Sequence, residues 1–590
     1  MTARHLAEVF RTTVDRHGDR PAMFWRDDDT WNQFTYSEVA DQVGQVASGL
    51  LSLGVQPGER VALFSENRPE WAIADLASLT ISAVTVPIYA TNTAEQAAYI
   101  LSQSGAQVVF VGDPDQLAAI ESVAARCPNL AHIIMLTGDA TEYTMTLTRL
   151  LELGAAKDRS EELEQLRAAY KTEQLASLIY TSGTTGEPKG VMLSHANFVH
   201  QVEAIDTFFD VGPDDRSLCF LPLSHVYERT WSYFIFSQGA QNYYLSNPKA
   251  VVDYLPEVKP TAMVSVPRLY EKVYAGVMSK AESASPLRKR LFDWALNVGG
   301  RFAATQNNSD KPGLALRASY ALADRLVLAK IRDVVGGPKN FFSAGGAPLS
   351  STIEEFFLAA GLLVCQGYGL TETSPMVTCN SPGRFRFGTV GHPVPGCEVR
   401  IGDDGEILVR GDNVMLGYYE NPEATAEVLR DGWLHTGDIG RIDDDGFLLV
   451  TDRLKDIIIT SGGKNIAPQR IETVVGRDHF VEQIAVIGDR RRFVSALIVP
   501  VFDVLERYAA EHGIEYGSRQ ELVTNPEIMA VFKERIDRQS EELAHYEKVK
   551  AFVLLDREFS QDDREITPTQ KIRRRIVEKS FSDEIEAMYA

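Results

Sequence analysis

A loop rich in hydroxyl groups and glycine is the segment best suited to chemistry. It reads Tyr180-Thr-Ser-Gly-Thr-Thr-Gly-Glu-Pro-Lys-Gly190 and joins two apolar stretches, 176–180 and 191–193. Glycine lets the backbone approach a ligand closely and adopt positive φ angles, so that N–H groups converge on an anion. Hydroxyls and an ammonium group donate further hydrogen bonds. We therefore expect triphosphate oxygens to be bound by Thr181, Ser182, Gly183, Thr184, Thr185 and Lys189.

This loop differs from the Walker A loop. Counted from Gly183, the second glycine of that motif would fall at Pro188, and an apolar strand pattern follows the loop where Walker A has a helix. Binding of phosphate by a helix N-terminus therefore does not apply. The alternative is a flexible hairpin tip, which accounts for the glycines and the serine but not for the density of threonine together with a lysine.

The elements that must position the loop alternate between strand and helix patterns. A capping-box pattern, Thr35 followed by Glu38, opens one helix. The next elements are expected at strand 60–64, helix 69–76, strand 84–88, strand 107–111 and helix 115–125. This order predicts an α/β fold with mostly parallel sheets and helices on both faces.

The polar, charged stretch 452–456 is the expected domain boundary. Before it, residues 396–447 are rich in turns and short strands, and after it a tail of about 135 residues mixes helices with strands. We therefore expect two domains, 1–452 and 453–590.

Composition excludes several classes of protein. The 590 residues carry 59 Lys and Arg against 81 Asp and Glu, a net charge of −22, which argues against nucleic-acid binding through phosphate contacts. The five cysteines lie far apart with no CxxC pair, which argues against a zinc ribbon or a disulfide framework. The first residues lack the apolar core of a signal peptide. Together these features predict a cytoplasmic globular protein.

Five segments, in order along nearly the whole chain, resemble the adenylate-forming superfamily of acyl-CoA synthetases, luciferases and adenylation domains. They are the loop above, Tyr368-Gly-Leu-Thr-Glu-Thr373, Trp433-Leu-His-Thr-Gly-Asp438, Asp452-Arg-Leu-Lys-Asp456 with Ser461-Gly-Gly-Lys-Asn465, and Pro568-Thr-Gln-Lys571. The resemblance implies a large N-terminal domain of parallel-rich sheets wrapped by helices, with a β-barrel-like part and a small mobile α+β C-terminal domain. It also implies ATP, Mg²⁺ and coenzyme A as cofactor or co-substrates.

The resemblance assigns the first reaction, in which a carboxylate attacks the α-phosphorus of ATP. Glu372 and Thr184 would hold Mg²⁺, since this ion prefers oxygen ligands, and Thr371 would contact the α-phosphate. Lys571 would be the catalytic cation between the substrate carboxylate and the α-phosphate. Because Lys571 lies in the tail, the tail must close on the large domain. A solvated lysine beside three arginines is the alternative.

The resemblance also assigns the nucleoside. Asp438 would accept the ribose hydroxyls with help from Arg453. Adenine would lie between the backbone and the stacked ring of Tyr368. The residues of this site would be Gly345, Gly346, Ala347, Tyr368 and Gly369. Structural turns are the alternative for these glycines and for Asp438.

In the second reaction a thiol attacks the acyl-adenylate. The resemblance implies that the tail swings about Lys455 and that Gly462 and Gly463 border the tunnel for pantetheine. The hinge residue of this family varies between Asp and Lys.

The segments 221–229 and 264–272 look like those of long-chain fatty acyl-CoA synthetases. Amino-acid activators place an Asp in the region equivalent to 221–231, and none is present here. A buried ammonium would then be unpaired, which is costly. His225 is expected near the carboxylate, and Tyr227 or Trp231 is either a gate of the acyl tunnel or core packing.

Three functions therefore remain. The first is a long-chain fatty acid:CoA ligase, the second a fatty acyl-AMP ligase that loads a carrier-protein thiol, and the third a non-enzymatic lipid-binding scaffold. The complete set of ATP-facing residues argues against the scaffold. Oligomeric state is not indicated by the sequence.

Residues 280–339 differ from the rest of the chain in charge, with eleven Lys and Arg against five Asp and Glu. Apolar residues such as Leu287, Leu291 and Trp294 lie there at helical spacing. The segment is either a solvated helical insertion or a basic amphipathic face in peripheral contact with anionic lipid.

Overall fold

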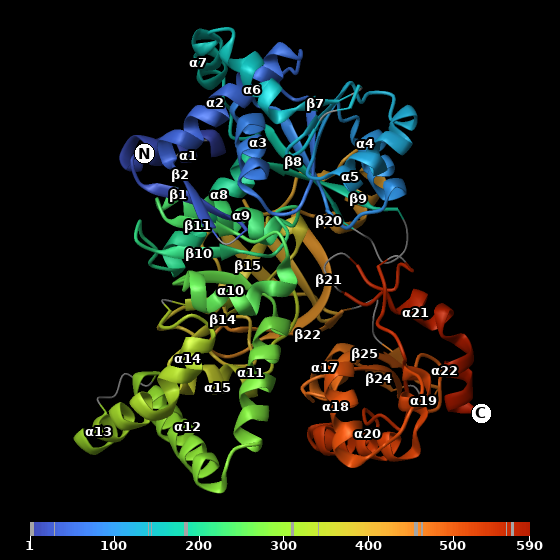
Figure 1. Ribbon diagram of the computed structural model, residues 1–590. Coiled ribbons are helices and arrows are strands. Elements are labelled where there is room, and N and C mark those ends of the chain that lie inside the picture. The colour runs from blue at the N-terminus through green and yellow to red at the C-terminus, as the bar shows by residue number, and fades with distance from the viewer. Residues whose placement is uncertain are drawn as a thin grey trace.

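The computed structural model describes residues 5–28, 30–139, 141–142, 144–181, 187–307, 312–339, 341–453, 458–461, 464–561, 563–567 and 571–590. A large part, formed by the first three quarters of the chain, carries a smaller part at the C-terminal end (Figure 1). One cluster of buried apolar residues lies wholly between Ile458 and Tyr589 and gives the smaller part a core of its own.

An eight-stranded sheet forms the centre of the large part. In sheet order its strands are β19 (Gly417–Tyr418), β9 (Lys189–Ser194), β8 (Leu175–Thr181), β4 (Val84–Ile88), β3 (Arg60–Phe64), β5 (Val108–Val111), β6 (His132–Met135) and β7 (Met145–Thr146). The run from β8 to β7 pairs in parallel, whereas β9 and β19 join antiparallel. All four residues of β5 are buried, as expected of a strand covered on both faces.

The strand–helix alternation expected from the sequence is confirmed. Strands β3 and β4 begin and end at the predicted residues, and β5 begins one residue later than predicted. The helix expected at 69–76 is α3, which extends to Thr80 because apolar residues continue to pack there. Strand pairing of β8 with β9 also confirms that the phosphate-loop sequence joins two strands.

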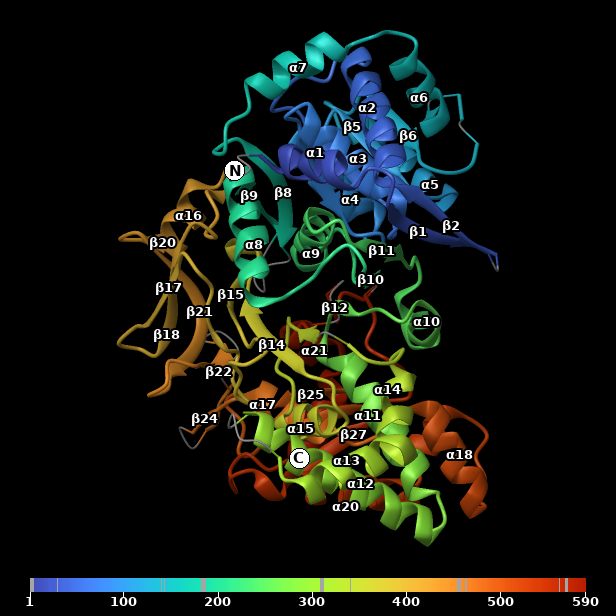
Figure 2. The ribbon, with the colours of Figure 1, turned by 90° about the vertical axis from the view of Figure 1, so that its left-hand side faces the viewer.

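Helices cover this sheet and the sheets beside it (Figures 1 and 2). Those of the first half are α1 (Leu6–His17), α2 (Tyr36–Ser52), α3 (Pro69–Thr80), α4 (Ala94–Ser104), α5 (Pro114–Val123), α6 (Leu147–Ala155), α7 (Ser160–Ala168), α8 (His195–Phe208) and α9 (Val226–Ser237). The predicted capping box at the start of α2 is present, with Thr35 and Glu38 bonded reciprocally.

Two further sheets lie between the eight-stranded sheet and the smaller part. One has the order β10 (Arg216–Cys219), β11 (Gln241–Tyr244), β1 (Pro21–Asp27) and β2 (Thr30–Thr35). The other has the order β12 (Ala262–Ser265), β13 (Phe341–Ala344), β14 (Val364–Gly369), β15 (Met376–Cys379) and β16 (His392–Pro393). Because β12, β13 and β14 are parallel, their carboxyl ends open onto one edge, where ligands of α/β proteins bind.

The part expected to be β-barrel-like contains an antiparallel sheet. Its strands are β17 (Cys397–Ile401), β18 (Glu406–Gly411), β21 (Trp433–Ile442), β20 (Leu429–Arg430) and β22 (Leu448–Arg453). Strand β21 carries Asp438, and β22 ends at Arg453, the register partner of Asp438.

The insertion between β12 and β13 is helical. It comprises α11 (Pro267–Glu282), α12 (Pro286–Asn307), α13 (Leu314–Ala323), a π-helical turn (Asp324–Leu328) and α14 (Ala329–Val334). The other helices of the large part are α10 (Val251–Val258), α15 (Ser351–Ala359) and α16 (Pro422–Val428).

The smaller part is α+β, as expected. Its strands are β23 (Ile458–Ile459), β24 (Asn465–Ile466), β25 (Val481–Ile487), β26 (Ser495–Pro500) and β27 (Ala551–Leu554). Its helices are α17 (Pro468–Val475), α18 (Phe502–His512), α19 (Arg519–Thr524), α20 (Pro526–Gln539), α21 (Arg574–Ser580) and α22 (Ser582–Tyr589). No helix in the described ranges combines the length and hydrophobicity that a membrane span requires.

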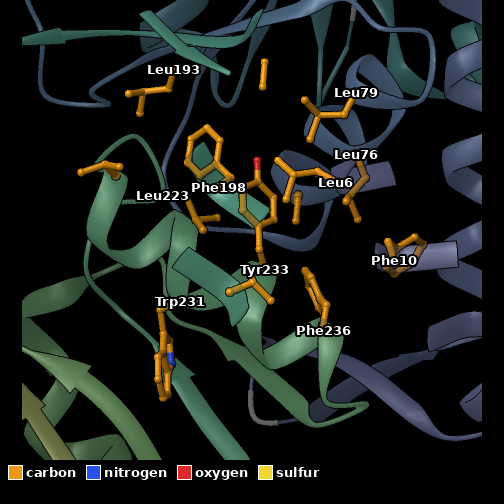
Figure 3. Close-up of a cluster of buried hydrophobic side chains, with 14 of the residues drawn as sticks. Leu6, Phe10, Leu76, Leu79, Leu193, Phe198, Leu223, Trp231, Tyr233 and Phe236 are labelled. Carbon is orange, nitrogen blue, oxygen red and sulfur yellow. The ribbon is translucent and has the colours of Figure 1, made fainter. Parts of the chain in front are cut away.

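The largest apolar core surrounds α9 (Figure 3). Trp231, Tyr233 and Phe236 project from this helix into the cluster, and the rings of Phe198 and Tyr233 meet edge to face with centroids 5.5 Å apart. Helix α9 is therefore held rigidly against α1, α3 and α8.

A buried histidine pair predicts acid sensitivity of this core. The imidazoles of His5 and His195 stack with centroids 3.4 Å apart, and burial lowers the pKa of His5 to about 3 and that of His195 well below its usual value. The unfolded chain therefore binds more protons below pH 6.5. For His5 we expect the free energy of unfolding to fall by about 1.4 kcal/mol per pH unit between 6.5 and 3.

Denaturant midpoints measured at pH 7.5 and 5.5 test this prediction. Replacement of His195 by Phe, which keeps a ring in the stack, should reduce the fall in stability by up to about 1.4 kcal/mol per pH unit, the share of one buried histidine. Replacement of the exposed His545 by Gln should not change it. An unchanged fall in the His195 variant contradicts the prediction.

Candidate active site

Lys571 and His225 come together from the two parts of the molecule. His225 is the N-cap of α9, where its Nδ1 accepts a hydrogen bond from the Tyr227 backbone at 3.2 Å. Burial, together with a smaller effect of the positive charge of Lys571, lowers the pKa of His225 to about 4. The Lys571 ammonium therefore lies near enough to act on this imidazole electrostatically, and the imidazole is neutral at physiological pH.

The turn that carries Lys571 is fixed at its base. Backbone groups of Thr567 and Lys571 pair, with the Thr567 N–H bonded to the Lys571 carbonyl at 2.8 Å. Nearby in the chain, the carboxylate of the fully buried Glu565 accepts a hydrogen bond from each of the two terminal nitrogens of Arg557, both at 2.7 Å. Such a two-pronged bond is among the strongest side-chain interactions and orients the turn.

An ion pair holds the smaller part in this position. Arg268, on α11, lies 2.7 Å from Glu482, on β25. The positive charge of Arg477 also acts on Glu271, which lies one turn after Arg268 on α11. The smaller part thus contacts the large part at α11 as well as near His225.

An apolar pocket lies beside the first turns of α9. Its walls are Ile205, Phe209, Tyr227, Thr230, Trp231, Val264, Ser343, Pro375 and Met376. The Tyr227 hydroxyl bonds to Ser343 Oγ at 2.7 Å, and the indole N–H of Trp231 donates to Ser217 at 2.8 Å. Both candidate gate residues therefore form walls of this pocket, and a side-chain hydrogen bond helps to position each of them.

The strands that flank the phosphate-loop sequence bring Lys189 near Glu372 through an intermediate residue, Tyr418. Thr181 and Lys189 face each other across β8 and β9, and the Lys189 ammonium lies 4.9 Å from the centre of the Tyr418 ring. The Tyr418 hydroxyl donates to Glu372 Oε1 at 2.9 Å. The structure thus brings Lys189 and Glu372 to one place, with Thr371 beside Glu372 at the start of a short 3₁₀ turn.

The described residues fit a Mg²⁺ that is shared with a substrate. Glu372 offers a carboxylate oriented by Tyr418, and within the described ranges no three His, Cys, Asp or Glu side chains gather as a metal cage. Mg²⁺ is commonly held by one or two protein oxygens together with phosphates and water. The other expected ligand, Thr184, lies outside the described residues.

Asp438, Tyr368 and Arg453 form one hydrogen-bonded group. Asp438 Oδ2 accepts from the Tyr368 hydroxyl at 2.7 Å, and Oδ1 accepts from Arg453 Nε at 2.8 Å. Burial first, and then the Asp438 carboxylate, raise the pKa of Tyr368, so the phenol remains a donor. Because each carboxylate oxygen has two acceptor sites, the bonded Asp438 retains capacity for a pair of hydroxyls.

The adenine segment follows β13 directly. The N–H of Gly345 bonds to the Ser265 carbonyl at 3.0 Å, and a Cβ at this position would lie 3.1 Å from the Tyr227 ring. Gly346 and Ala347 are exposed at the carboxyl edge of the sheet. Gly369 ends β14 where a Cβ would collide with the Pro375 carbonyl at 1.8 Å, so close backbone packing accounts for this glycine.

Seven of the predicted site residues lie outside the described residues: Ser182, Gly183, Thr184, Thr185, Lys455, Gly462 and Gly463. Their roles, like those of the described site residues, stay predictions.

Two residues at the site were not found from the sequence. Tyr418 connects Lys189 with Glu372, and Ser343 orients Tyr227. Tyr418 lies in an unremarkable Gly-Tyr-Tyr stretch, and no spacing relates it to the phosphate loop. Ser343 is adjacent to the segment predicted to bind adenine, and this position in the sequence is the signal that could have identified it.

Family models match both parts of the molecule. Residues 10–419 match the model described as AMP-binding enzyme, and residues 455–590 match that of the AMP-binding enzyme C-terminal domain. The chain belongs to the AMP-binding enzyme family. The predicted resemblance to the adenylate-forming superfamily is thereby confirmed.

Curated relatives of this AMP-binding enzyme refine the comparison. It is 39% identical over 565 residues to the long-chain-fatty-acid–CoA ligase FadD15 of Mycobacterium bovis, covering 95% of this chain and 93% of the relative. It is 34% identical to long chain acyl-CoA synthetase 7, peroxisomal, of Arabidopsis thaliana, covering 95% and 82%. The chain thus falls in the long-chain acyl-CoA synthetase subgroup.

Solved structures agree on the fold. A crystal structure of the anthranilate CoA ligase AuaEII in complex with anthranoyl-AMP superposes with a TM-score of 0.75 at 20% identity, covering 99% of this chain and 98% of that chain. A fatty acyl CoA synthetase of Mycobacterium tuberculosis superposes with a TM-score of 0.62 at 24% identity, covering 98% and 99%. The expected α/β architecture is confirmed.

Proposed function

We propose that the protein is a long-chain fatty acid:CoA ligase. ATP and a fatty acid give acyl-AMP and pyrophosphate, and coenzyme A then gives acyl-CoA and AMP. The observation that carries this proposal is the position of Lys571, which belongs to the C-terminal part yet acts on His225 beside the apolar pocket. A cation is thereby aimed at the place where a fatty carboxylate would meet the nucleotide.

Residues on three sheets divide the binding of ATP in this proposal. Lys189 and the phosphate loop neutralise the β- and γ-phosphates, and Asp438 accepts the ribose hydroxyls, with adenine against Gly345 to Ala347. Glu372 would hold Mg²⁺, which would supply neutralisation of phosphate charge when bound. Thr371 and Lys571 contact the α-phosphate, where negative charge increases in the transition state.

The walls of the pocket favour an uncharged acyl chain. The one acidic residue of the segment that lines amino-acid sites in relatives is Glu228, and burial raises its pKa well above the usual value, although its bond from the Leu221 N–H opposes this. A neutral carboxyl does not compensate an ammonium group. Apolar side chains form most of the remaining wall.

Pyrophosphate release with palmitate and ATP, measured with and without coenzyme A, tests the function. We expect slow release without coenzyme A and sustained turnover to palmitoyl-CoA with it. Turnover only with a carrier protein selects the acyl-AMP ligase, whose single supporting observation is the same adenylation site. No release in either case refutes both enzymes. Peripheral contact with lipid through residues 280–339 is also part of the proposal.

Movement of the smaller part about Lys455 is also part of the proposal. Replacement of Lys455 by Pro fixes φ near −65° and removes an N–H. We expect it to slow thioester formation at least tenfold while adenylate formation stays within about threefold. Quenched-flow assays of each half-reaction measure this, with Lys455→Ala as the control that retains a rotatable backbone. Equal losses in both half-reactions contradict a hinge at this residue.

A further inference from the structure

Helices α12 and α13 and the turn that follows them concentrate exposed apolar side chains. Six of the ten large hydrophobic residues that are exposed in the described ranges lie there: Leu287, Leu291, Trp294, Leu314, Leu322 and Leu326. Leu287 and Leu314 are the extremes, with 78% and 84% of their surface exposed. Single exposed leucines are ordinary, but six within forty residues are not.

These side chains lie in stripes. Leu287, Leu291 and Trp294 are spaced i, i+4, i+7 and therefore share one face of α12. Further along this helix Ala295 and Val298 are buried in a cluster with residues of α11 and α15. The stacked rings of Phe302 and Tyr320, with centroids 3.9 Å apart, join α12 to α13. The apolar stripes are thus surplus to the packing that holds the helices in place.

Basic residues flank the stripes. Arg288, Lys289 and Arg290 are all exposed in the first turns of α12, and Arg317 and Arg325 are exposed on the second helix and the turn after it. Residues 280–339 carry a charge of +6, which leaves −28 for the rest of the chain. An apolar stripe between arginine and lysine is the pattern of a helix that lies in a membrane interface. The long stems of these residues also reach outward to phosphates.

The place of this segment in the fold connects it to the pocket. The chain leaves the pocket wall at Val264 on β12, passes through the helical insertion, and returns at Ser343 on β13, which is the register partner of Val264. Figures 1 and 2 show α12 and α13 projecting at the end of the large part opposite the eight-stranded sheet. The projecting helices and two pocket residues are therefore consecutive parts of one crossover.

We propose that α12 and α13 dock the protein on an anionic lipid surface, with Leu287, Leu291 and Trp294 entering the interface and the flanking cations pairing with lipid phosphates. The charge of the segment is complementary to such a surface, whereas the acidic remainder of the chain is repelled from it. Only the biological purpose of this docking rests on the proposed function: a long-chain fatty acid partitions into bilayers, and the docked enzyme would take it up there.

Vesicle co-sedimentation of the full chain tests the proposal. We expect binding to vesicles of 70% phosphatidylcholine and 30% phosphatidylglycerol at 50 mM salt, and at least about tenfold weaker binding to pure phosphatidylcholine vesicles or at 500 mM salt. The variants L287S/L291S and R288E/K289E/R290E should each lose at least about tenfold in affinity. All five side chains are exposed, so folding should be retained.

Matched controls change exposed residues elsewhere. I442S/Y516S removes two exposed apolar residues, and R441E/R490E/R507E reverses three exposed arginines. The apolar control should bind as the unaltered protein does, and the charge control should bind as well or slightly less. Tryptophan emission should shift to the blue on addition of anionic vesicles, and W294F should lose most of that shift.

The proposal would be overturned by an absence of binding to anionic vesicles at low salt, or by equal binding of the α12 variants and the unaltered chain. It would also be overturned if the chain self-associates without binding vesicles and L287S/L291S abolishes that self-association. This last result would identify a second copy of the chain as the partner of the surface. Octanoate activation in detergent-free solution should be unchanged in the α12 variants. If no acid is activated, the proposed function fails while the vesicle measurement keeps its meaning.

Discussion

Replacement of Lys571 by Met should lower the rate of adenylate formation by about a hundred- to a thousand-fold, because removal of one preorganised donor to a transition-state oxyanion has an effect of this size. The ammonium lies where it acts on His225, and the base of its turn is fixed by the pair of Arg557 with Glu565. Methionine keeps an unbranched side chain of nearly the same length and removes the ammonium group, with its charge and its hydrogen-bond donors. Single-turnover pyrophosphate release with palmitate measures the effect.

The second half-reaction separates this role from general damage. When preformed palmitoyl-adenylate and coenzyme A are supplied, the Lys571 variant should form palmitoyl-CoA within about threefold of the unaltered rate. Arg575→Met is the matched control, since this exposed residue belongs to the same basic run. It should change neither half-reaction. Comparable losses in both half-reactions would show that Lys571 is structural.

His225 offers an independent readout of the same contact. Two causes lower its pKa, burial first and the Lys571 charge second. Removal of the charge should therefore raise the pKa of His225, while burial still keeps it below the usual value. The imidazole resonances of the Lys571 variant should titrate at higher pH. An unchanged titration would mean that the two residues are apart in solution.

Much of the fold follows from local patterns in the sequence. The strands at 60–64 and 84–88 are predicted to the residue because short, mostly apolar segments suit buried strands. The helix at 115–125 ends two residues early, at Val123, where the chain tightens into a 3₁₀ turn. Helix ends depend on capping and tertiary packing, which periodicity does not record.

The candidate site follows from the sequence only where motifs carry it. Asp438, Arg453 and Tyr368 were each identified from a separate segment, and the structure joins them by hydrogen bonds. Tyr418 was missed because its meaning lies in contacts with Lys189 and Glu372, which are far away in the chain. Such contacts arise from the order of strands in the sheet, here the pairing of β19 with β9. No local spacing of residues in the sequence encodes this strand order.

The buried pair of Arg229 and Asp75 is the clearest case of structure beyond the sequence. Arg229 was noted only as part of a family-like segment, yet both side chains are buried almost completely, at 1% and 2% exposure. Arg229 Nη1 donates to Ser177 at 2.7 Å, and its Nη2 bonds Asp75 and Thr85. The pair therefore ties α9 to α3, β8 and β4, the elements around the phosphate loop and the pocket.

Replacement of Arg229 by Met should lower the free energy of unfolding of the large part by about 3–5 kcal/mol, because it leaves the Asp75 carboxylate buried without its partner. Denaturant unfolding followed by Trp fluorescence measures this. The C-terminal part contains no tryptophan, since the last of the six is Trp433, and the signal therefore reports on the large part. Tyr233→Phe, which removes the 2.6 Å bond to Asp75 Oδ2 and the 2.8 Å bond that Arg229 Nε donates to the same hydroxyl, should cost about 1–3 kcal/mol.

The double variant D75L/R229M decides what the pair is for. Apolar residues of similar volume avoid the desolvation penalty of buried charges, so the double variant should regain most of the stability that R229M loses. If the pair also orients α9, the double variant should be stable yet have a raised KM for palmitate, since Tyr227 and Trp231 on this helix form walls of the pocket. A double variant as unstable as R229M would show that the loss comes from packing, because the uncompensated charge has then been removed.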